Sequence, residues 1–467
     1  MHTMDAMSQS VTFLGAAETV TGSRHLLNLD GHKVLVDCGL FQGGRQLERL
    51  NYEPFGFEPS ELEAVVITHA HMDHIGLLPR LVREGFTGPI YATHATVDLS
   101  QISLPDSGRL QEEEARYRNR HGGGPDGRPV RPLYTESEAF ACLKQFRKVP
   151  YGEFHDLPGK AKWRYLPAGH ILGSAFAEIY FANGERILMS GDLGRFNIPF
   201  IKDPTAIDFA EYLVVESTYG DRLHSHEDPM AKLEEIIKRA VHTGGVILVP
   251  SFAIGRTQEL LYYISRLQNE GRIPRIPIFV DSPMATSVTR VLERSPEEFD
   301  AETEEALREH LNLMEPQGVQ FVKDKEQSKA LNSQRGPLMI ISGSGMANGG
   351  RIIYHLLHRL EDPSTTVLFT GYQAEGTLGR RLLEEASSVH LLGQFVEVRA
   401  NIERLNALSA HADQGEILAW LHGFKQKPRR TFIVHGEPPA QAALAEKIRT
   451  ELGWELVIPF KGESFPL

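Results

Sequence analysis

The stretch Val65-Val66-Ile67-Thr68-His69-Ala70-His71-Met72-Asp73-His74-Ile75-Gly76 is the most informative part of this sequence. It begins with an apolar run that is typical of a buried β-strand, and Leu77, Leu78 and Leu81 then follow at helical spacing. The histidines and the aspartate between these two runs form the pattern H-x-H-x-D-H. We therefore expect them on a short loop between a strand and a helix, where a rigid scaffold holds polar groups in place.

This pattern predicts a metal site, because imidazole and carboxylate groups are the ligands that zinc and similar divalent ions prefer. His69 and His71 are two residues apart on an extended segment and can turn toward one ion, whereas Asp73 and His74 follow the bend and can reach a second. Two ions about 3.5–4 Å apart can share a bridging water and bind a phosphoryl group. The alternative is a histidine-rich surface loop without metal, although chance seldom produces this spacing.

The length and composition limit the architecture and the cell compartment. A chain of 467 residues exceeds what one core usually supports, so we expect two domains or one domain with a large insertion. The net charge of −12 argues against nucleic-acid binding driven by overall charge, but it leaves room for a local basic groove. The two cysteines, Cys38 and Cys142, exclude a disulfide framework. No signal-like start and no membrane-spanning apolar run occur, which predicts a cytoplasmic protein without a membrane partner.

Further polar residues stand at the ends of apolar, strand-like runs. Asp37 ends a predicted β-meander over residues 11–37; alone it would be a turn former, but beside the histidine motif it can orient metal ligands. Asp192 and Glu216 each follow an apolar strand, and Asp192 is well placed to bridge two ions. Three strand-end carboxylates near a histidine cluster are hard to explain as three separate turns. His170, in a loop of small residues, would be a structural histidine if it stood alone.

Two longer regions have a different texture. Residues 95–148 are mostly helical and polar, which indicates a helical excursion beside the site, and the run Gln111–Glu114 reads as a solvated face. Residues 222–396 alternate apolar strands with helices, which predicts a parallel sheet covered on both faces. Within it, the glycine-rich loop 342–350 lies between a strand and a helix. Its backbone N–H groups could approach an anion, or it could be a tight turn without a ligand.

Two more histidines occur in the C-terminal part. His411 lies in Ser409-Ala410-His411-Ala412-Asp413, just before a predicted helix, and His435 ends an apolar strand before Gly436. Together, these motifs resemble those of the metallo-β-lactamase-fold nucleases with a β-CASP insertion, and most closely the bacterial RNases related to the cleavage-and-polyadenylation endonuclease. The resemblance covers nearly the whole chain, with the motifs in order.

The resemblance implies an α/β fold: a metallo-β-lactamase αβ/βα sandwich with an inserted β-CASP α/β domain. Residues 1–221 would form the first part of the sandwich, 222–396 the β-CASP domain, and 397–467 the completion of the sandwich. The implied ligands of one ion are His69, His71 and His170. The implied ligands of the other ion are Asp73, His74 and His435. Asp192 matches the bridging carboxylate, Asp37 the aspartate that orients a ligand, and Glu216 and His411 the acidic and histidine motifs beside the leaving group.

The implied reaction is hydrolysis of RNA phosphodiester bonds. In this family the last motif carries histidine in RNA-acting members and usually valine in DNA-acting ones, so His435 favours RNA over the alternative of a DNA-processing nuclease. A hydroxide activated by two metal ions would attack, and the products would carry 5′-phosphate and 3′-hydroxyl ends. His411, oriented by Glu216, is the expected proton donor, and Asp73 belongs to the same catalytic group. Five histidine and two aspartate ligands suit Zn²⁺ best and allow Mn²⁺.

The substrate contacts are expected in the inserted region, in loops that mix glycine, aromatic residues and arginine. The candidate RNA-binding residues are Ser251, Arg256, Ser342, Ser344, Gly345, Tyr372 and Arg380. A thioester hydrolase or lactonase would share the histidine motif but would need neither this region nor the His411 motif. A non-catalytic RNA-binding subunit would have lost ligands, whereas every expected position is filled. Endonuclease or 5′-3′ exonuclease action both stay open, and a homodimer is an expectation at the level of the family.

Overall fold

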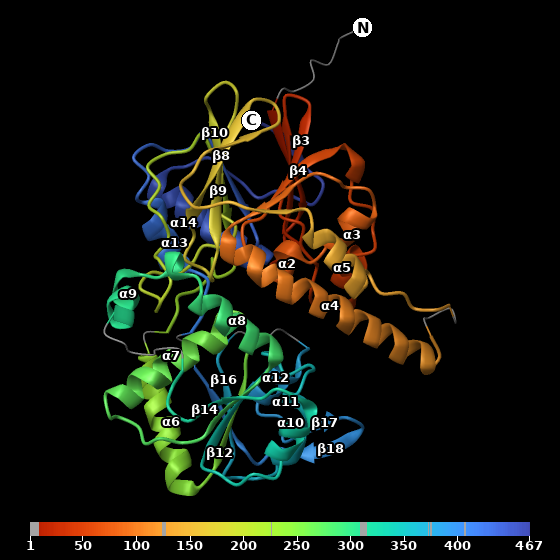
Figure 1. The fold of residues 1–467 in the computed structure, drawn as a ribbon. Helices are drawn as coiled ribbons and strands as arrows, with labels where there is room; N and C mark the ends of the chain where they lie inside the picture. The colour runs from red at the N-terminus through yellow and green to blue at the C-terminus, as the bar shows by residue number, and fades with distance from the viewer. Residues whose placement is uncertain are drawn as a thin grey trace. The chain divides into compact units, whose positions relative to one another are not determined.

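The computed structural model describes residues 9–123, 128–225, 227–308, 315–371, 373, 376–405 and 408–467. The chain divides into two compact units (Figure 1). Unit 1 consists of residues 1–223 together with 411–467, and unit 2 consists of residues 224–410. Each unit has its own hydrophobic core.

Two seven-stranded sheets form the centre of unit 1 (Figure 1). The first, in the order β22-β1-β2-β3-β4-β5-β6, consists of β22 (Ser464–Pro466), β1 (Gln9–Gly15), β2 (Arg24–Leu29), β3 (His32–Val36), β4 (Leu62–Val66), β5 (Ile90–Ala92) and β6 (Phe146–Lys148). The second, in the order β21-β20-β11-β10-β9-β8-β7, consists of β21 (Leu456–Val457), β20 (Arg430–Val434), β11 (Tyr212–Glu216), β10 (Arg186–Met189), β9 (Ala175–Tyr180), β8 (Ala161–Pro167) and β7 (His155–Leu157).

The two sheets pack face to face, because apolar side chains of both contribute to one buried cluster. Phe13 and Val66 of the first sheet belong to this cluster together with Trp163 and Phe432 of the second. The opposite face of the second sheet is covered by helices α13 (Gln414–Leu421) and α14 (Pro438–Leu452), which form a second cluster with it. The remaining helices of unit 1 are α1 (Arg45–Leu50), α2 (Met72–Ile75), α3 (Leu78–Arg83), α4 (His94–Arg120) and α5 (Glu136–Leu143), with a 3₁₀ turn at Pro59–Glu61. The predicted αβ/βα sandwich is confirmed.

The strand directions explain why polar residues gather in unit 1. Strands β3, β4 and β5 run parallel, as do β10, β11 and β20. The carboxyl ends of parallel strands meet at one edge of a sheet, where ligands bind in α/β proteins. Glu216, the last residue of β11, pairs in register with Val434 of β20 and so lies beside His435.

Unit 2 contains a six-stranded, all-parallel sheet in the order β14-β13-β15-β12-β16-β19. Its strands are β12 (Val246–Pro250), β13 (Ile278–Asp281), β14 (Val319–Phe321), β15 (Leu338–Ser342), β16 (Thr366–Phe369) and β19 (Asn401–Arg404), beside a hairpin of β17 (Ser388–Leu391) and β18 (Gln394–Glu397). Its helices are α6 (Pro229–Thr243), α7 (Arg256–Asn269), α8 (Pro283–Glu293), α9 (Ala301–Arg308), α10 (Lys325–Leu331), α11 (Ile352–Arg359) and α12 (Leu378–Leu383), with a 3₁₀ turn at Pro296–Glu298. Separate apolar clusters lie on the two faces, so the predicted doubly covered parallel sheet is confirmed.

Two local features differ from the sequence-based expectation or extend it. Asp73 and His74 lie in the single helical turn α2, rather than on a loop, and His71 occupies the position just before that turn. The helical excursion consists mainly of α4, which is 27 residues long and begins where the Thr93 side chain accepts a hydrogen bond from Thr96 N. Among the described residues, no helix combines the length and the apolar character needed to cross a membrane.

Candidate metal centre

Seven side chains from four separate segments of unit 1 meet at the carboxyl ends of its strands. They are His69, His71, Asp73 and His74 after β4, His170 between β8 and β9, Asp192 after β10, and His435 after β20. Their ligating atoms form a group of four, His69, His71, His170 and Asp192, and a group of three, Asp73, His74 and His435. Within each group the atoms lie within 4.8 Å of one another.

In the group of four, the nitrogens of three imidazole rings lie close to one another and to one oxygen of Asp192. His71 Nδ1 is 3.1 Å from both His69 Nε2 and His170 Nε2. Asp192 Oδ2 is 3.4 Å from His69 Nε2 and 3.5 Å from His170 Nε2. Ligands at the zinc–nitrogen distance of about 2.0–2.1 Å in a tetrahedron are separated by roughly 3.3 Å. The spacing of these four atoms therefore fits one divalent ion.

The group of three has similar spacing and shares a carboxylate with the first. His74 Nε2 is 3.2 Å from His435 Nε2, and Asp73 Oδ2 is 3.5 Å from His435 Nε2. Asp192 turns its other oxygen, Oδ1, to within 3.2 Å of His74 Nε2. One oxygen of Asp192 thus faces each group, which is the arrangement of a carboxylate able to bridge two ions.

The charge of the cluster also fits cations. Asp37, Asp192 and Glu216 are almost completely buried, and Asp73 is mostly buried. In the described part of the chain, no lysine or arginine forms an ion pair with any of them. Buried carboxylates are costly unless positive charge compensates them. Burial raises the pKa of Asp192, but the neighbouring histidines lower it by more. The pKa of this carboxyl is therefore well below its usual value, and the group is ionised.

The histidines fall into two electrostatic classes. Burial lowers the pKa of His71 to about 3 and that of His170 well below its usual value. Both rings are therefore neutral at pH 7, as metal ligands must be. Burial also opposes protonation of His74, but Asp192 and Asp37 raise its pKa well above the usual value. The carboxylates around His74 thus attract positive charge, which a metal ion can supply in place of a proton.

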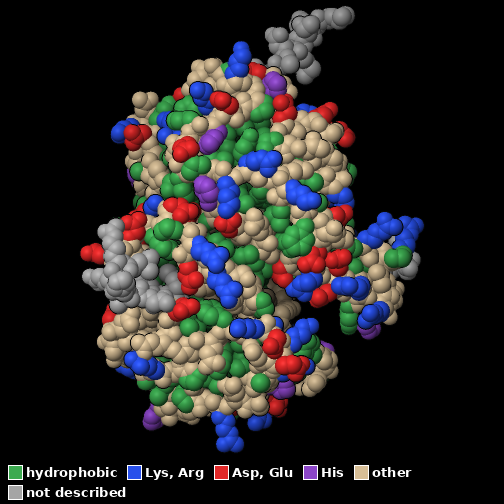
Figure 2. Space-filling view, viewed as in Figure 1, with side chains coloured by type: hydrophobic (Ala, Val, Ile, Leu, Met, Phe, Trp, Pro, Cys, Tyr) green, Lys and Arg blue, Asp and Glu red, His purple; other side chains and the backbone are tan. Residues whose placement is uncertain are grey.

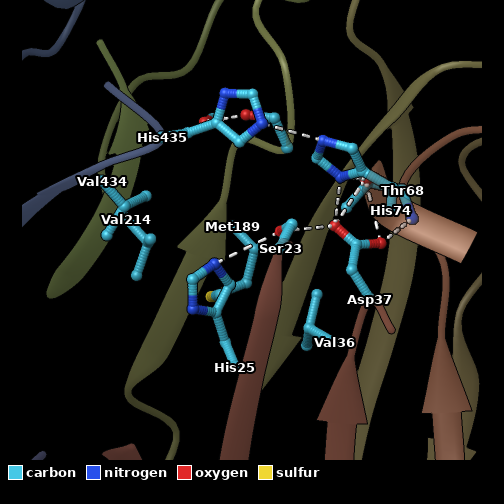
Figure 3. A pocket seen from close by; sticks show the side chains of 12 residues that line it. Ser23, His25, Val36, Asp37, Thr68, His74, Met189, Val214, Val434 and His435 are labelled. Carbon is cyan, nitrogen blue, oxygen red and sulfur yellow. Dashed lines mark hydrogen bonds and ion pairs between the residues drawn. The ribbon is translucent and has the colours of Figure 1, made fainter. Parts of the chain in front are cut away.

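Asp37 orients His74 through the ring nitrogen that faces away from the other candidate ligands. The carboxylate accepts hydrogen bonds from Thr68 N at 2.8 Å, Thr68 Oγ1 at 2.9 Å, Ser23 Oγ at 3.2 Å and His74 Nδ1 at 2.7 Å. Figure 3 shows these residues around a small cavity that His435 and His25 also line. Because Nδ1 of His74 is bound to Asp37, its Nε2 is the atom that faces His435 and Asp192. This is how carboxylates orient histidine ligands in metal sites.

Close backbone packing fixes the loops that carry these side chains. A Cβ atom added to Gly39, just after β3, would lie 1.5 Å from the carbonyl oxygen of Asp73. A Cβ atom added to Gly194 would lie 1.9 Å from the carbonyl group of Gly169, which precedes His170. Only glycine allows such approaches. The segments that bear Asp73, His170 and Asp192 therefore pack closely against neighbouring backbone, which restricts their positions.

Glu216 and His411 form a third group with Asp192. His411 Nδ1 is 3.0 Å from Glu216 Oε1 and 3.9 Å from Asp192 Oδ2. Glu216 is fixed by two backbone donors, Leu193 N at 2.8 Å and Thr218 N at 3.1 Å. Burial lowers the pKa of His411, but Glu216 and Asp192 outweigh it and raise this pKa to about 9. His411 is therefore a protonated, oriented imidazolium at the edge of the cluster.

Sequence reasoning missed the residues that support the cluster. Thr68 and Ser23 donate to Asp37, and no motif marks either of them. His25 is buried 3.5 Å from Ser23 Oγ, and burial lowers its pKa to about 3, so it is neutral. The only signal in the sequence was position, because Thr68 is the residue directly before the histidine motif.

The candidate RNA-binding residues belong to unit 2 and have mixed surroundings. Ser251 and Ser342 are buried at the carboxyl ends of β12 and β15, and in the glycine-rich loop Gly345 is buried and Ser344 is partly exposed. Arg256 is only 8% exposed and donates to Glu259 on its own helix, so little of its guanidinium is offered to a ligand. Arg380 is exposed and bonds Glu384. Tyr372 lies outside the described residues. Their role in binding RNA stays a prediction.

Comparison with known proteins identifies the family. The metallo-beta-lactamase superfamily matches residues 25–243, the Beta-Casp domain matches 257–382, and the Zn-dependent metallo-hydrolase RNA specificity domain matches 396–459. Ribonuclease TTHA0252 of Thermus thermophilus is 39% identical over 97% of this chain and 99% of its own length. The chain belongs to the β-CASP ribonuclease family of the metallo-β-lactamase superfamily. Both the resemblance and the metallo-hydrolase class predicted from the sequence are confirmed.

More distant relatives of this β-CASP protein extend along the whole chain. The transcription termination factor FttA of Methanosarcina mazei is 27% identical over 95% of this chain and 69% of its own length. The factor of the same name from Pyrococcus horikoshii is 30% identical over 95% of this chain and 68% of its own length. A crystal structure of a protein of unknown function from Enterococcus faecalis V583 has a TM-score of 0.55 at 14% identity, covering 98% of this chain and 100% of that one. That likeness concerns the fold alone.

Proposed function

We propose that this β-CASP protein is a metal-dependent ribonuclease whose metal site is the cluster around Asp192. The observation that carries the proposal is the position of the two Asp192 oxygens, one 3.4 Å from His69 Nε2 and the other 3.2 Å from His74 Nε2. With Glu216 and His411 alongside, one centre would contain two ion sites and a proton donor. A metal site with a purely structural role would need the ion ligands but not the proton donor.

The proposed ligands of the two ions are the group of four and the group of three defined above, with Asp192 shared. The ions would lower the pKa of a bound water and neutralise charge on the scissile phosphate. Nitrogen and carboxylate ligands without cysteine suit Zn²⁺ and allow Mn²⁺. The family description, a Zn-dependent metallo-hydrolase, supports zinc.

The chain's own residues supply the proton and the positioning. The leaving 3′-oxygen needs a proton, and protonated His411 can donate it from Nε2, because its Nδ1 is engaged by Glu216. Glu216 in turn is held by two backbone N–H groups, so the imidazole keeps one orientation. Asp37 keeps His74 Nε2 pointing into the cluster. The expected products carry 5′-phosphate and 3′-hydroxyl ends.

RNA is the proposed substrate for two reasons. The last motif of the chain carries His435, the residue found in RNA-acting members of the family. The relative with 39% identity is named a ribonuclease. Cleavage of RNA labelled separately at each end, with 5′-phosphate or 5′-hydroxyl, distinguishes internal cutting from stepwise 5′-3′ degradation. Equal cleavage of DNA and RNA of one sequence would reject this substrate assignment. The expected homodimer is a separate prediction, which a light-scattering measurement of the molar mass in solution tests.

The role of His411 has its own test. Changing His411→Ala should reduce turnover about 100-fold or more, because general acid catalysis contributes about 10²–10⁴. Metal content, measured on protein purified without chelator, should stay at the wild-type level. The matched control is His422→Ala, which removes a half-exposed histidine of the same unit that lies 3.8 Å from Glu451. Loss of metal in the His411 variant would show that this residue is a ligand rather than a proton donor.

A further inference from the structure

The end of helix α4 carries a cluster of exposed arginines outside the candidate metal centre. Arg116, Arg118 and Arg120 occupy the last turns of α4, and Arg128 and Arg131 follow on the segment that returns toward α5. All five are exposed. We call residues 116–121 and 128–131 the α4 tip. Figure 2 shows blue side chains gathered on the projection that Figure 1 identifies as the end of α4.

The returning segment is fixed against the helix, so the cluster is a defined surface. Asn119 donates from Nδ2 to the carbonyl of Val130 at 3.0 Å and accepts from Val130 N at 2.7 Å. Closer to the start of α4 than Asn119, Gln111 Oε1 accepts a hydrogen bond from Leu133 N at 3.0 Å. These side-chain clamps hold the segment with Arg128 and Arg131 beside the arginines of α4.

Little negative charge compensates this cluster. Arg116, Arg120, Arg128 and Arg131 form no ion pair with any residue that the structure describes, and Arg118 lies 3.9 Å from Glu114. The other glutamates of the preceding run have their own partners: Glu113 bonds Arg109, and Glu112 accepts from Glu136 N. The acidic residue within the tip sequence, Asp126, belongs to residues 124–127, which lie outside the described part. In a chain with a net charge of −12, this is a local positive surface.

An aromatic side chain accompanies the arginines. Tyr117 is 64% exposed, and its ring lies 4.3 Å from that of His121 with an interplanar angle of 34°. An exposed ring among arginines is the combination with which proteins bind single-stranded nucleic acid, since aromatic rings stack bases and cations follow the phosphates. An acidic protein partner would not require the ring.

We propose that the α4 tip binds single-stranded RNA outside the metal centre, as an accessory site for long substrates; this inference rests on the proposed ribonuclease function. Helix α4 connects the two places. Near its start, Thr93 and Thr96 donate their hydroxyls to the carbonyl of Gly173, in the loop that carries His170. A helix of 27 residues is roughly 40 Å long at 1.5 Å per residue. A strand that advances about 3.4 Å per nucleotide, as a stacked strand does, needs on the order of ten nucleotides to span that distance.

The charge contribution is tested by binding in a His411→Ala background, which slows cleavage during the measurement. The triple variant Arg116→Ala/Arg120→Ala/Arg128→Ala should bind a 30-nucleotide RNA about tenfold more weakly at low salt. The slope of log affinity against log salt should fall by about 2, since each lost phosphate contact accounts for about 0.7. Replacing the same arginines with lysine should retain most of the affinity and the slope. The control Lys427→Ala/Lys447→Ala/Arg449→Ala removes as much charge from another surface of unit 1 and should change neither.

Stacking is tested separately at one position. Tyr117→Ala should weaken binding of the same RNA about tenfold, because the variant has no aromatic ring on which a base can stack. Tyr117→Phe should bind as the wild type does, because the ring rather than the hydroxyl is used. Equal weakening by both changes would show that the hydroxyl rather than the ring contacts the RNA, and would overturn the stacking role.

Substrate length separates this inference from the proposed function. With His411 intact, the triple alanine variant should show a higher KM and an unchanged kcat on the 30-nucleotide RNA, and the defect should shrink to within twofold on a 5-nucleotide RNA. Wild-type affinity, KM and salt slope in the triple variant would overturn the accessory site while leaving the ribonuclease intact. If the wild-type protein with metal cuts neither RNA, the proposed function itself has failed.

Discussion

At the scale of single residues, we expect the candidate metal centre to depend on Asp37, although Asp37 belongs to neither group of candidate ligands. Its two carboxylate oxygens accept four hydrogen bonds, including one from His74 Nδ1. In Asp37→Asn, one oxygen becomes an amide N–H₂ group that cannot accept. We expect metal affinity to fall by about 10–100-fold, the usual effect of losing a partner that orients a ligand. Competition with a chelator of known affinity measures the change.

The control for this change is Asp30→Asn. Asp37 and Asp30 both have positive φ, 60° and 53°, and asparagine tolerates this region well. Asp30 is exposed in the turn between β2 and β3. Its replacement should therefore leave metal affinity and thermal unfolding unchanged. Wild-type affinity in Asp37→Asn would mean that His74 is held by its own helical turn and not by the carboxylate.

The residue scale also shows what the sequence could and could not predict. The types of the reactive groups were visible, because histidine and carboxylate at the ends of apolar strands stand out. Their neighbours were not, since the contact between Glu216 and His411 spans 195 positions and that between His74 and His435 spans 361. Those contacts follow from the order of strands in the sheets, which periodicity does not encode. Only the family resemblance supplied them in advance.

At the scale of elements, the start of α4 packs closely against the loop that carries His170. Gly173 has φ +80°, and an added Cβ would lie 2.6 Å from Thr96 N and 2.9 Å from Thr93 Oγ1. Gly173→Ala should therefore separate the loop from the start of α4, lower metal affinity at least tenfold by displacing His170, and lower the unfolding temperature. Metal titration with thermal unfolding measures both effects.

Gly184 offers the matched comparison for that prediction. It also has positive φ, +88°, but a Cβ there would meet nothing within 4 Å. Gly184→Ala should show only the left-handed backbone penalty of about 1–2 kcal/mol and full metal affinity. If both variants bind metal equally well, the junction with α4 does not position His170.

In unit 2, the strand β13 ends in a buried carboxylate that ties several elements together. Asp281 accepts from Ser328 Oγ at 2.6 Å, Arg351 at 2.6 Å and His355 Nε2 at 2.7 Å, joining α10 and α11 to the sheet. Asp281→Asn should lower the free energy of unfolding by about 2–3 kcal/mol, since hydrogen bonds to charged groups are the strong ones. Denaturant unfolding measures this. Asp324→Asn, an exposed helix cap that asparagine replaces well, should have almost no effect.

The stabilisation by Asp281 should also depend on pH in a defined direction. Burial raises its pKa, but the hydrogen bonds from His355, Ser328 and Arg351 outweigh this and hold the pKa below its usual value. A depressed folded pKa gives stability that is complete above the unfolded value of about 3.9 and is lost as pH falls through the folded value. The difference between wild type and Asp281→Asn should therefore be largest at neutral pH and shrink below about pH 4. A constant difference down to pH 3 would contradict this account.

Single elements also limited the sequence-based prediction. The turn α2 was expected as a loop, because four helical residues, Met72–Ile75, are too few to show a helical period. The α4 tip was not identified either: its arginines are separated by the glycine-rich stretch, and only the Asn119 clamp brings Arg128 and Arg131 to the helix.

At the scale of the molecule, the sequence predicted an inserted domain but could not fix where it ends. The boundary predicted at 396 stays a prediction; the match to the RNA specificity domain spans residues 396–459. By compactness, unit 2 continues to Ala410, because β19 pairs with β16 in its sheet, Thr366 beside Asn401. One criterion follows sequence similarity and the other follows strand pairing, and composition does not change between 397 and 410 in a way that would choose between them.

The division into two cores predicts that metal removal destabilises one unit selectively. All candidate ligands belong to unit 1, and the apolar clusters of unit 2 contain none of them. An ion that binds only the folded state at 100 times its Kd stabilises by about 2.7 kcal/mol. Chelation should therefore lower the unfolding temperature of unit 1 by roughly 5–10 °C, given about 2–4 °C per kcal/mol for a domain of its size.

Hydrogen exchange read by peptide can assign that loss to its unit. After chelation, peptides from β4, β10 and β20 should exchange faster, because candidate ligands follow the carboxyl ends of these strands, while peptides from β12 and β15 should not change. Asp281→Asn should give the opposite pattern with metal present, since its partners lie in α10 and α11. If chelation instead accelerated exchange equally in both units, the two cores would unfold as one cooperative body, and the metal centre would stabilise the whole chain rather than the sandwich that contains it.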